Sequence, residues 1–240
     1  MSYKGRSVLA VVPARGGSKS IPRKNLRTIN GISLLGRAIL TARDARDLDA
    51  IIVSTDDDEI MAEGAKYGAR VPFRRPPELA SDRATSVDMW IHAWSECEKL
   101  DGRTYDISVL LEPTSPMRRV EDIRRTLDTV IEGHYPAAAT VSPTPAHFTP
   151  NKTLTLDGPI IGFYHPEGAR YSLRQAIPRY YHRNGLCYAV TRKHLLEDRL
   201  IIEAHCAGVV VDRYVVNIDE PYELRIAEFL LGEASGDAGT

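Results

Sequence analysis

Residues 13–25, PARGGSKSIPRKN, bring together the side chains that a phosphate site requires. The stretch contains two adjacent glycines, no acid, and four cations, which are Arg15, Lys19, Arg23 and Lys24. Glycines allow close approach of the backbone to a ligand and present N–H groups to anions. Because charge-assisted hydrogen bonds are strong, the stretch predicts a site for a triphosphate or pyrophosphate. On charge alone, a solvated basic face is the alternative interpretation.

Two familiar phosphate-binding motifs are absent from this stretch. The pattern G-x-x-x-x-G-K-[ST] would place a glycine before the lysine, whereas Lys19 follows Ser18. The dinucleotide pattern G-x-G-x-x-G is absent as well. The prediction of an anion site therefore depends on residue types and on their position in the fold.

The cationic stretch directly follows an apolar run, SVLAVV, that predicts a buried strand. Comparable runs lie at 50–55, 107–112 and 137–142, and helical spacing separates them at 33–43, 56–68, 85–100 and 120–133. This alternation predicts a three-layer, Rossmann-like α/β/α fold with a mostly parallel sheet. Ligands of such sheets bind at the carboxyl ends of the strands, where residues 13–25 fall.

The alternation stops at residues 143–184, which are rich in Pro, His, Tyr and Arg. Within this segment NKTLTLDG predicts a small hairpin. We expect one domain over residues 1–232, with 143–184 as an insertion that caps the site or makes a dimer contact. Strand character returns at 186–191 and 208–218, an amphipathic helix is expected at 220–232, and 233–240 is expected to be a flexible tail.

Acids and tryptophans outside the cationic stretch have structural explanations. The acids of STDDDEI precede a predicted helix, where they are expected to cap its N-terminus. Trp90 and Trp94 are one helical turn apart, as expected of core residues.

Composition narrows the class of protein. The chain has 240 residues, 43% of them hydrophobic, and a formal net charge of −1, which argues against a nucleic-acid partner. Three isolated cysteines without a CxxC pair fit a reducing compartment and predict no zinc site. No apolar run approaches ~18 residues, so we expect no membrane partner and a cytoplasmic protein.

Six segments, in order, resemble the cytidylyltransferases that activate acidic sugars, in particular the CMP-N-acylneuraminate (CMP-sialic acid) synthetase family. They are ARGGSKSIPRKNLRTINGISLLGRAI, IIVSTDDDEI, RPPELASDRATS, LLEPTSPMR, RNGLCYAV and NIDEPYEL. The resemblance implies a nucleotidyltransferase fold with a small inserted dimerisation hairpin region. It also implies transfer of CMP from CTP to an acidic acceptor with release of pyrophosphate, a Mg²⁺ cofactor and a homodimer.

The resemblance assigns donor residues position by position. The triphosphate of CTP would contact Ala14, Arg15, Gly16, Ser18, Lys19, Lys24 and Asn25. Cytosine would contact Arg75, Ala84 and Ser86. Catalysis would depend on Arg15, Lys19, Lys24 and Asp219. Ser20 departs from the family, which more often has glycine at this position.

Acceptor and metal residues follow from the same resemblance. The acceptor would contact Glu112, Thr114, Ser115, Asn184 and Tyr188, and its carboxylate would meet Lys152 and Arg174 of the insertion. Magnesium would bind Asp219, with Asn217 assisting directly or through water. Two departures are informative, since the family usually has glutamine where this chain has Glu112 and aspartate where it has Asn217. A carboxylate only accepts hydrogen bonds, whereas an amide also donates them.

These departures leave the acceptor open. A nine-carbon nonulosonate such as N-acetylneuraminate is the first expectation. The alternatives are a different acid, either Kdo or a small phosphonate such as phosphonoformate, and a nucleotide-binding regulator that does not turn CTP over.

Overall fold

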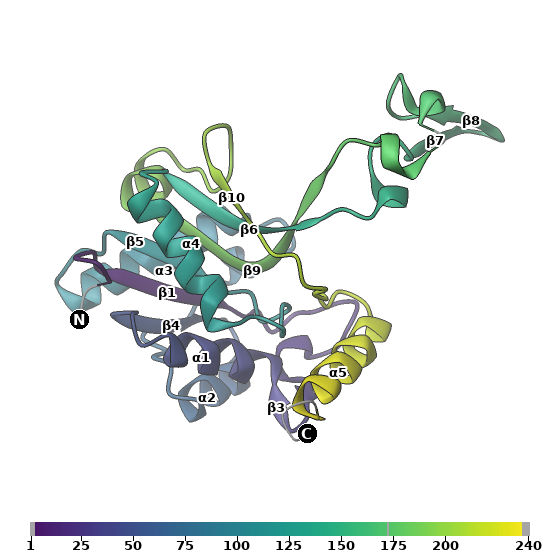
Figure 1. Ribbon diagram of the computed structural model, residues 1–240. Helices are drawn as coiled ribbons and strands as arrows, with labels where there is room; N and C mark the ends of the chain where they lie inside the picture. The colour runs from purple at the N-terminus through teal and green to yellow at the C-terminus, as the bar shows by residue number, and fades with distance from the viewer. Residues whose placement is uncertain (1–2, 172, 237–240) are drawn as a thin grey trace.

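The structure, a computed structural model, describes residues 3–171 and 173–236, and these build a six-stranded sheet in the order β10-β6-β9-β5-β1-β4 (Figure 1). Its strands are β1 (Val8–Pro13), β4 (Ala50–Ser54), β5 (Ile107–Leu110), β6 (Ala137–Pro143), β9 (Tyr181–Thr191) and β10 (Ala207–Val210). β1 pairs in parallel with β4 and β5, and β10 pairs in parallel with β6. β9 runs antiparallel to its neighbours β5 and β6, so the sheet is mixed but mostly parallel.

Helices cover both faces of this sheet. On one face pack α1 (Leu34–Ala45), α2 (Asp58–Lys66) and α4 (Val120–Glu132), whose Leu35, Ile60 and Leu127 belong to the same core cluster as the strand residues Val8 and Ala10. On the other face lies α3 (Ser86–Asp101), which buries Trp90 and Trp94 against Leu9 and Val11. Consecutive strand residues point to opposite faces, so β1 serves both layers. The predicted three-layer α/β/α fold is confirmed.

One acid of STDDDEI caps the helix that follows it. Asp57 is the N-cap of α2, and its Oδ1 accepts hydrogen bonds from the N–H groups of Glu59 at 2.9 Å and Ile60 at 3.0 Å. A carboxylate at this position satisfies orphan donors and interacts favourably with the helix dipole. The capping prediction is confirmed for Asp57, whereas Asp56 accepts from the Gly16 N–H and Glu59 pairs with Arg23.

A third, smaller core holds the last helix. α5 (Pro221–Gly236) packs near the two-stranded ladder of β2 (Thr28–Ile29) and β3 (Ile32–Ser33), where Ile29, Ile218 and Ala227 are buried together. The helix continues through residue 236, into the segment 233–240 that was expected to be a tail; residues 237–240 lie outside the described part. In the described residues, no helix combines the length and apolarity needed to span a membrane.

Residues 144–180 leave the sheet as an arm that projects away from the body (Figure 1). The arm departs from the carboxyl end of β6, the same edge at which β1 ends, and returns through β9. Its tip carries the predicted hairpin, formed by β7 (Leu154–Asp157) and β8 (Ile160–Phe163).

The layer of α1 and α4 yields a stability prediction. Leu127 is fully buried in the core beneath α4, so Leu127→Ala should lower the free energy of unfolding by about 2–5 kcal/mol through lost burial and a residual cavity. The control Leu100→Ala removes the same atoms from a side chain that is 55% exposed and should change stability by about 0.5 kcal/mol or less. Urea unfolding of both variants checks this, and equal midpoints would contradict the packing described.

Candidate active site

A cleft of about 530 Å³ opens where β1 and β5 end. Ten residues assigned from the sequence to CTP or to the acceptor line it: Arg15, Ser18, Lys19, Lys24, Asn25, Arg75, Ala84, Ser86, Glu112 and Thr114. Asp219, assigned to the metal, lines it as well. The structure thus brings together segments that are up to 204 positions apart in the chain, from Arg15 to Asp219.

Lys24 ties the loop after β1 to the segment that precedes α5. Its ammonium donates to the backbone oxygen of Ile218 at 2.9 Å and lies 3.1 Å from Oδ1 of Asp219. Only 14% of the Lys24 side chain is exposed, so the positive charge is held in place rather than left to solvent. Ser20 strengthens the junction, because its hydroxyl donates to the backbone oxygen of Asp219 at 2.5 Å.

Ala14 and Gly16 support the loop from beneath. Ala14 is buried, and the Gly16 N–H donates to Oδ1 of Asp56 at 3.0 Å. A Cβ on Gly16 would lie 2.8 Å from Oδ2 of Asp57, so only glycine fits against this acid. The Gly16 N–H, expected to face a phosphate, is therefore directed at Asp56, while Asn25 steadies the loop by donating to the Arg15 backbone oxygen at 3.0 Å.

Acids from elsewhere in the chain neutralise the cations of residues 13–25. Asp82 bridges two of them, with Oδ1 lying 3.0 Å from Nη1 of Arg15 and Oδ2 lying 2.5 Å from Nζ of Lys19. Arg23 pairs with Glu59 in α2. The local sequence shows an unopposed positive loop, whereas the fold supplies a counter-charge to each of its cations.

Arg75 is a buried cation that also lines the cleft. It is 4% exposed; Nε donates to the Ser54 hydroxyl at 3.0 Å, and Nη2 donates to the Ser54 backbone oxygen. Burial lowers the pKa of Arg75 to about 10, so it remains charged at neutral pH. Nη1 has no hydrogen-bond partner among the described residues, so it remains available to an acceptor atom of a ligand. The apolar side chains of Leu79 and Met89 line the same cleft.

Glu112 follows β5 and faces the other half of the cleft. Burial is the main cause that raises the pKa of its carboxyl group, and the nearby Arg118 guanidinium opposes the rise. Gly185 makes room for it: a Cβ there would lie 2.5 Å from Oε2 of Glu112 and 2.6 Å from Oγ of Ser115. Since Gly185 also has φ of +70°, a side chain at this position would be strained twice.

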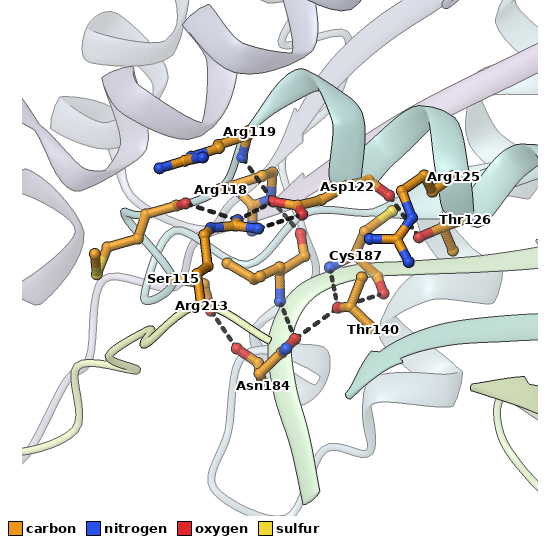
Figure 2. Close-up of polar contacts among 12 residues, drawn as sticks. Ser115, Arg118, Arg119, Asp122, Arg125, Thr126, Thr140, Asn184, Cys187 and Arg213 are labelled. Carbon is orange, nitrogen blue, oxygen red and sulfur yellow. Dashed lines mark hydrogen bonds and ion pairs between the residues drawn. The ribbon is translucent and has the colours of Figure 1, made fainter. Parts of the chain in front are cut away.

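Ser115, Asn184 and Tyr188 lie behind the cleft wall. Figure 2 shows Asn184 within a buried network: its Oδ1 accepts from the Thr140 hydroxyl at 2.6 Å, and Ser115 donates to the Asn184 backbone oxygen at 3.1 Å. Tyr188 is buried, which raises its pKa to about 12. These three residues hold the wall, and none of them lines the cleft itself.

Arg118 connects this wall to the strand β9. Its guanidinium donates to the backbone oxygens of Glu112 at 2.6 Å and Gly185 at 3.2 Å, and also to that of Leu186. A buried guanidinium that satisfies three carbonyls fixes the loop after β5 against β9. Residues 112–116, which form the EPTSP turn, are thereby held in position relative to β9.

The side chains of Asn217 and Asp219, the two residues assigned to the metal, are hydrogen-bonded to each other. The Asn217 amide nitrogen donates to Oδ2 of Asp219 at 2.9 Å, while its Oδ1 accepts from the Ser115 hydroxyl at 3.1 Å. In this arrangement Asn217 positions the Asp219 carboxylate, and its assistance to a metal, directly or through water, stays a prediction. At the start of α5, Glu223 accepts from the N–H groups of Asp219 and Glu220, both at 2.7 Å.

Lys152 and the backbone of Arg174 belong to residues 144–180, which form the projecting arm (Figure 1). Lys152 does not line the cleft. Most of the residues assigned to CTP thus line a cleft within one chain, whereas the segment that carries Lys152 and Arg174 projects away from the body.

Sequence reasoning missed Asp82, Ser20 and Arg118 as parts of this site. Asp82 belongs to the segment RPPELASDRATS, but its partners Arg15 and Lys19 lie 67 and 63 positions earlier in the chain. The one available signal was the excess of cations without local acids, which requires a counter-charge somewhere. Arg118 carried no signal, because its partners are backbone oxygens.

A cation-lined cleft at the carboxyl ends of parallel strands, with a buried arginine beside it, defines a nucleotide-binding α/β enzyme. The chain also shares its fold with a solved structure of CMP:2-keto-3-deoxy-manno-octonic acid synthetase complexed with CTP. The match has a TM-score of 0.72 at 18% identity and covers 95% of this chain and 99% of the other.

The family is shown by sequence. The model of the family described as cytidylyltransferase matches residues 9–212, so the chain belongs to the cytidylyltransferase family and is a nucleotidyltransferase. The chain is 30% identical to CMP-N,N'-diacetyllegionaminic acid synthase of Legionella pneumophila, over 93% of this chain and 96% of that protein. It is 29% identical to pseudaminic acid cytidylyltransferase of Campylobacter jejuni, over 92% and 95%. The resemblance inferred from the six motifs is confirmed.

Lys24 provides a test of the site. Lys24→Ala removes a fixed charge from the cleft and should lower the rate of CTP turnover by roughly 100-fold or more, as for the loss of other preorganised donors. Lys66→Ala, which removes an exposed lysine of α2, should leave the rate unchanged. Steady-state rates of both, with circular dichroism to verify folding, check this; near-normal turnover by Lys24→Ala would remove the lysine from the site.

Proposed function

We propose that this enzyme transfers CMP from CTP to a nonulosonic acid, a nine-carbon acidic sugar, and releases pyrophosphate. The observation that carries the proposal is the cleft, which joins the cationic loop, Arg75 and the EPTSP turn in one cavity. The chain's similarity to legionaminic and pseudaminic acid enzymes favours this acceptor class.

The donor half of the cleft has the chemistry for a cytidine triphosphate. Cytosine presents acceptor atoms that the unpaired Nη1 of Arg75 could meet, and Leu79 and Met89 offer apolar contact to its ring. Arg15, Lys19 and Lys24 would bind the phosphates. The acceptor hydroxyl oxygen would lose its proton to solvent and form a bond to the α-phosphorus while the bridging P–O bond to the β-phosphate breaks, so that pyrophosphate departs with the bonding pair. Positioning and charge neutralisation would supply most of the catalysis.

The side chains of the cleft suit a magnesium ion that is bound jointly by a protein carboxylate and by the phosphates of a nucleotide. Among the described residues, no three or more His, Cys, Asp or Glu side chains are grouped to hold a metal without a ligand. Magnesium is commonly held by one or two carboxylates together with substrate phosphates. Asp219 would provide the carboxylate and Asn217 would orient it. When bound, the ion would neutralise charge on the phosphate oxygens.

The acceptor half points to a ligand that offers hydrogen-bond donors. Glu112 can only accept hydrogen bonds when ionised, so hydroxyl or amide N–H groups of a sugar acid would suit it. Its charge would repel the acceptor's own carboxylate, which must then lie on another side of the site. Lys152 and Arg174, the cations assigned to that carboxylate, are on the arm.

The arm is suited to a second copy of this chain. Leu154 pairs with Phe163 and Leu156 pairs with Ile161 across the hairpin, so the four share one apolar face. All four are 49–74% exposed in the single chain. A two-stranded ladder is barely stable without a packing partner, and the arm leaves the body at the edge where the cleft opens. A homodimer would bury this face and allow the arm of one subunit to approach the cleft of the other.

An acceptor panel tests the function. With radiolabelled CTP and Mg²⁺, the enzyme should release pyrophosphate with at least one of legionaminic, pseudaminic or N-acetylneuraminic acid, and release should stop when Mg²⁺ is chelated. Kdo and phosphonoformate in the same panel represent the other acid acceptors. A preference for either would overturn the nonulosonate assignment. Tight CTP binding without release by any acid would favour the regulator instead.

Sedimentation tests the dimer. The wild-type protein should sediment at twice its chain mass of 26.7 kDa, and Leu156→Asp combined with Ile161→Asp should sediment as a single chain, because charges cannot be buried unpaired. Thr155→Asp introduces a charge on the other face of the same hairpin and should leave the dimer intact. A monomeric wild-type protein at micromolar concentration would contradict the proposal.

A further inference from the structure

Asp82 occupies the two cations that a triphosphate would need. Its Oδ1 lies 3.0 Å from Nη1 of Arg15 and its Oδ2 lies 2.5 Å from Nζ of Lys19. All three residues line the same cleft. Lys19 and then Arg15 lower the pKa of Asp82, so the carboxylate is charged at any pH near neutrality. A carboxylate with both oxygens on two different cations resembles a phosphate in charge and geometry.

The surroundings of Asp82 allow this contact to be exchanged. The Asp82 side chain is 49% exposed, and that of Lys19 is 83% exposed, so neither is locked by packing. Ion pairs this exposed contribute little stability and form and break readily. The turn that carries Asp82 has short-range backbone bonds, from Ala84 N–H to the Ser81 oxygen at 3.2 Å and from Ala80 N–H to the Pro77 oxygen at 3.0 Å. A local movement would release the acid without unfolding an element.

The other charged contacts of the cleft do not have this property. Asp219 holds Lys24, but that lysine is mostly buried and also bonds the Ile218 backbone oxygen. Glu59 holds Arg23 from α2, and neither residue lines the cleft. Asp82 is thus the carboxylate positioned to compete with a ligand for two cleft cations at once.

We propose that Asp82 is an internal stand-in for phosphate, which yields Arg15 and Lys19 to the incoming triphosphate and reclaims them as pyrophosphate leaves. The proposal rests on the function proposed above. No covalent bond changes in this exchange: two ion pairs with a carboxylate are replaced by ion pairs with phosphate oxygens, and the reverse follows the reaction. The residue is a positioning residue, because it acts on the cations rather than on the reacting atoms.

Competition of this kind has a measurable cost in affinity. A ligand that requires the open state binds more weakly by the fraction of time that this state is populated. If Asp82 holds the cations for about two-thirds to nine-tenths of the time, removal of its charge should tighten anion binding about three- to tenfold. The same change should slow the departure of pyrophosphate.

Asp82 lies in the same segment of the chain as the residues assigned to the cytosine base. Asp82 lies between Arg75, which lines one wall of the cleft, and Ala84 and Ser86, which line it as well. A nucleotide that engages the cleft through its base would contact the same turn that must release the cations. Cytidine triphosphate would therefore displace Asp82 more effectively than inorganic phosphates of similar charge.

The test uses Asp82→Asn in the full-length protein, with inorganic pyrophosphate as the probe. Calorimetric titration at fixed Mg²⁺ should show three- to tenfold tighter pyrophosphate binding than the wild type, and steady-state assays should show lower KM for CTP together with lower kcat. Asp47→Asn is the matched control, because it removes an acid paired with Arg124 at 2.9 Å outside the cleft. It should bind pyrophosphate as the wild type does.

Lys19→Ala separates exchange from a general charge effect. If Asp82 occupies Lys19, the loss of this lysine should weaken pyrophosphate binding more in the Asp82→Asn background than in the wild type. Independent effects of the two changes would contradict the exchange.

The results of these experiments distinguish failure of the Asp82 exchange from failure of the proposed function. Unchanged or weaker pyrophosphate binding by Asp82→Asn, with normal binding by the wild type, would overturn the exchange and leave the proposed function standing. A wild-type protein that binds neither pyrophosphate nor CTP would overturn both. A fall in kcat with no gain in pyrophosphate affinity would assign Asp82 to the chemical step instead, and so would also overturn the exchange.

Discussion

The contact between Lys24 and the segment Ile218–Asp219 holds the site together. It joins the loop after the first strand to the residues before the last helix, and it does so through a largely buried ammonium that bonds a backbone oxygen and a carboxylate. The surroundings reinforce it: the Ile218 N–H donates to the Thr114 oxygen at 2.8 Å. The cationic loop, the EPTSP turn and the metal-binding candidate therefore share one junction. A displacement of any one would be transmitted to the others.

A second support fixes the acceptor wall through hydrogen bonds rather than ion pairs. Arg118 donates to the backbone oxygens of Glu112, Gly185 and Leu186, and the Thr140 hydroxyl of the neighbouring strand donates to Asn184 (Figure 2). Because Gly185 has no side chain, Glu112 and Ser115 can approach the β9 backbone closely. Backbone and buried polar groups support the cleft wall, which explains why Ser115, Asn184 and Tyr188, unlike Glu112 and Thr114, do not line the cleft. They shape the surface that a ligand would meet.

Local signals predicted most of the fold, and failures occurred where distant residues decide the outcome. Apolar runs located β1, β4, β5 and β6, because a strand buried on both faces is continuous in hydrophobicity. Helical periodicity located α1 to α4 equally well. Residues 211–218 were expected to continue a strand, but β10 ends at Val210 and the chain turns toward Thr114. The continuation of α5 to residue 236 was missed as well.

The cations of the candidate site were predictable, but the acids that pair with Arg15, Lys19 and Arg23 were not. Arg15, Lys19 and Lys24 lie together in sequence, so their shared role could be inferred from residues 13–25 alone. Asp82 and Glu59 reach them only through the fold. The direction of the Asn217 amide likewise depends on the Ser115 hydroxyl, 102 positions away. Ion pairs between distant loops produce no periodic pattern in the sequence. The near-zero net charge of the chain indicates that counter-charges exist, but not which acids provide them.

The division of charge between the two halves of the cleft limits how an acidic acceptor could bind. The donor half presents cations that are compensated by mobile or exposed acids, whereas the acceptor half presents Glu112, a carboxylate that burial disfavours in its charged form. An acceptor carboxylate beside Glu112 would add repulsion to that burial. Under the proposed function, the acceptor must therefore turn its hydroxyl and amide groups toward Glu112 and its carboxylate away from it. Outside the donor half, the cations assigned to meet that carboxylate, Lys152 and Arg174, belong to the arm. Acceptor binding would then require an arm to be near the cleft, whereas CTP binding would not.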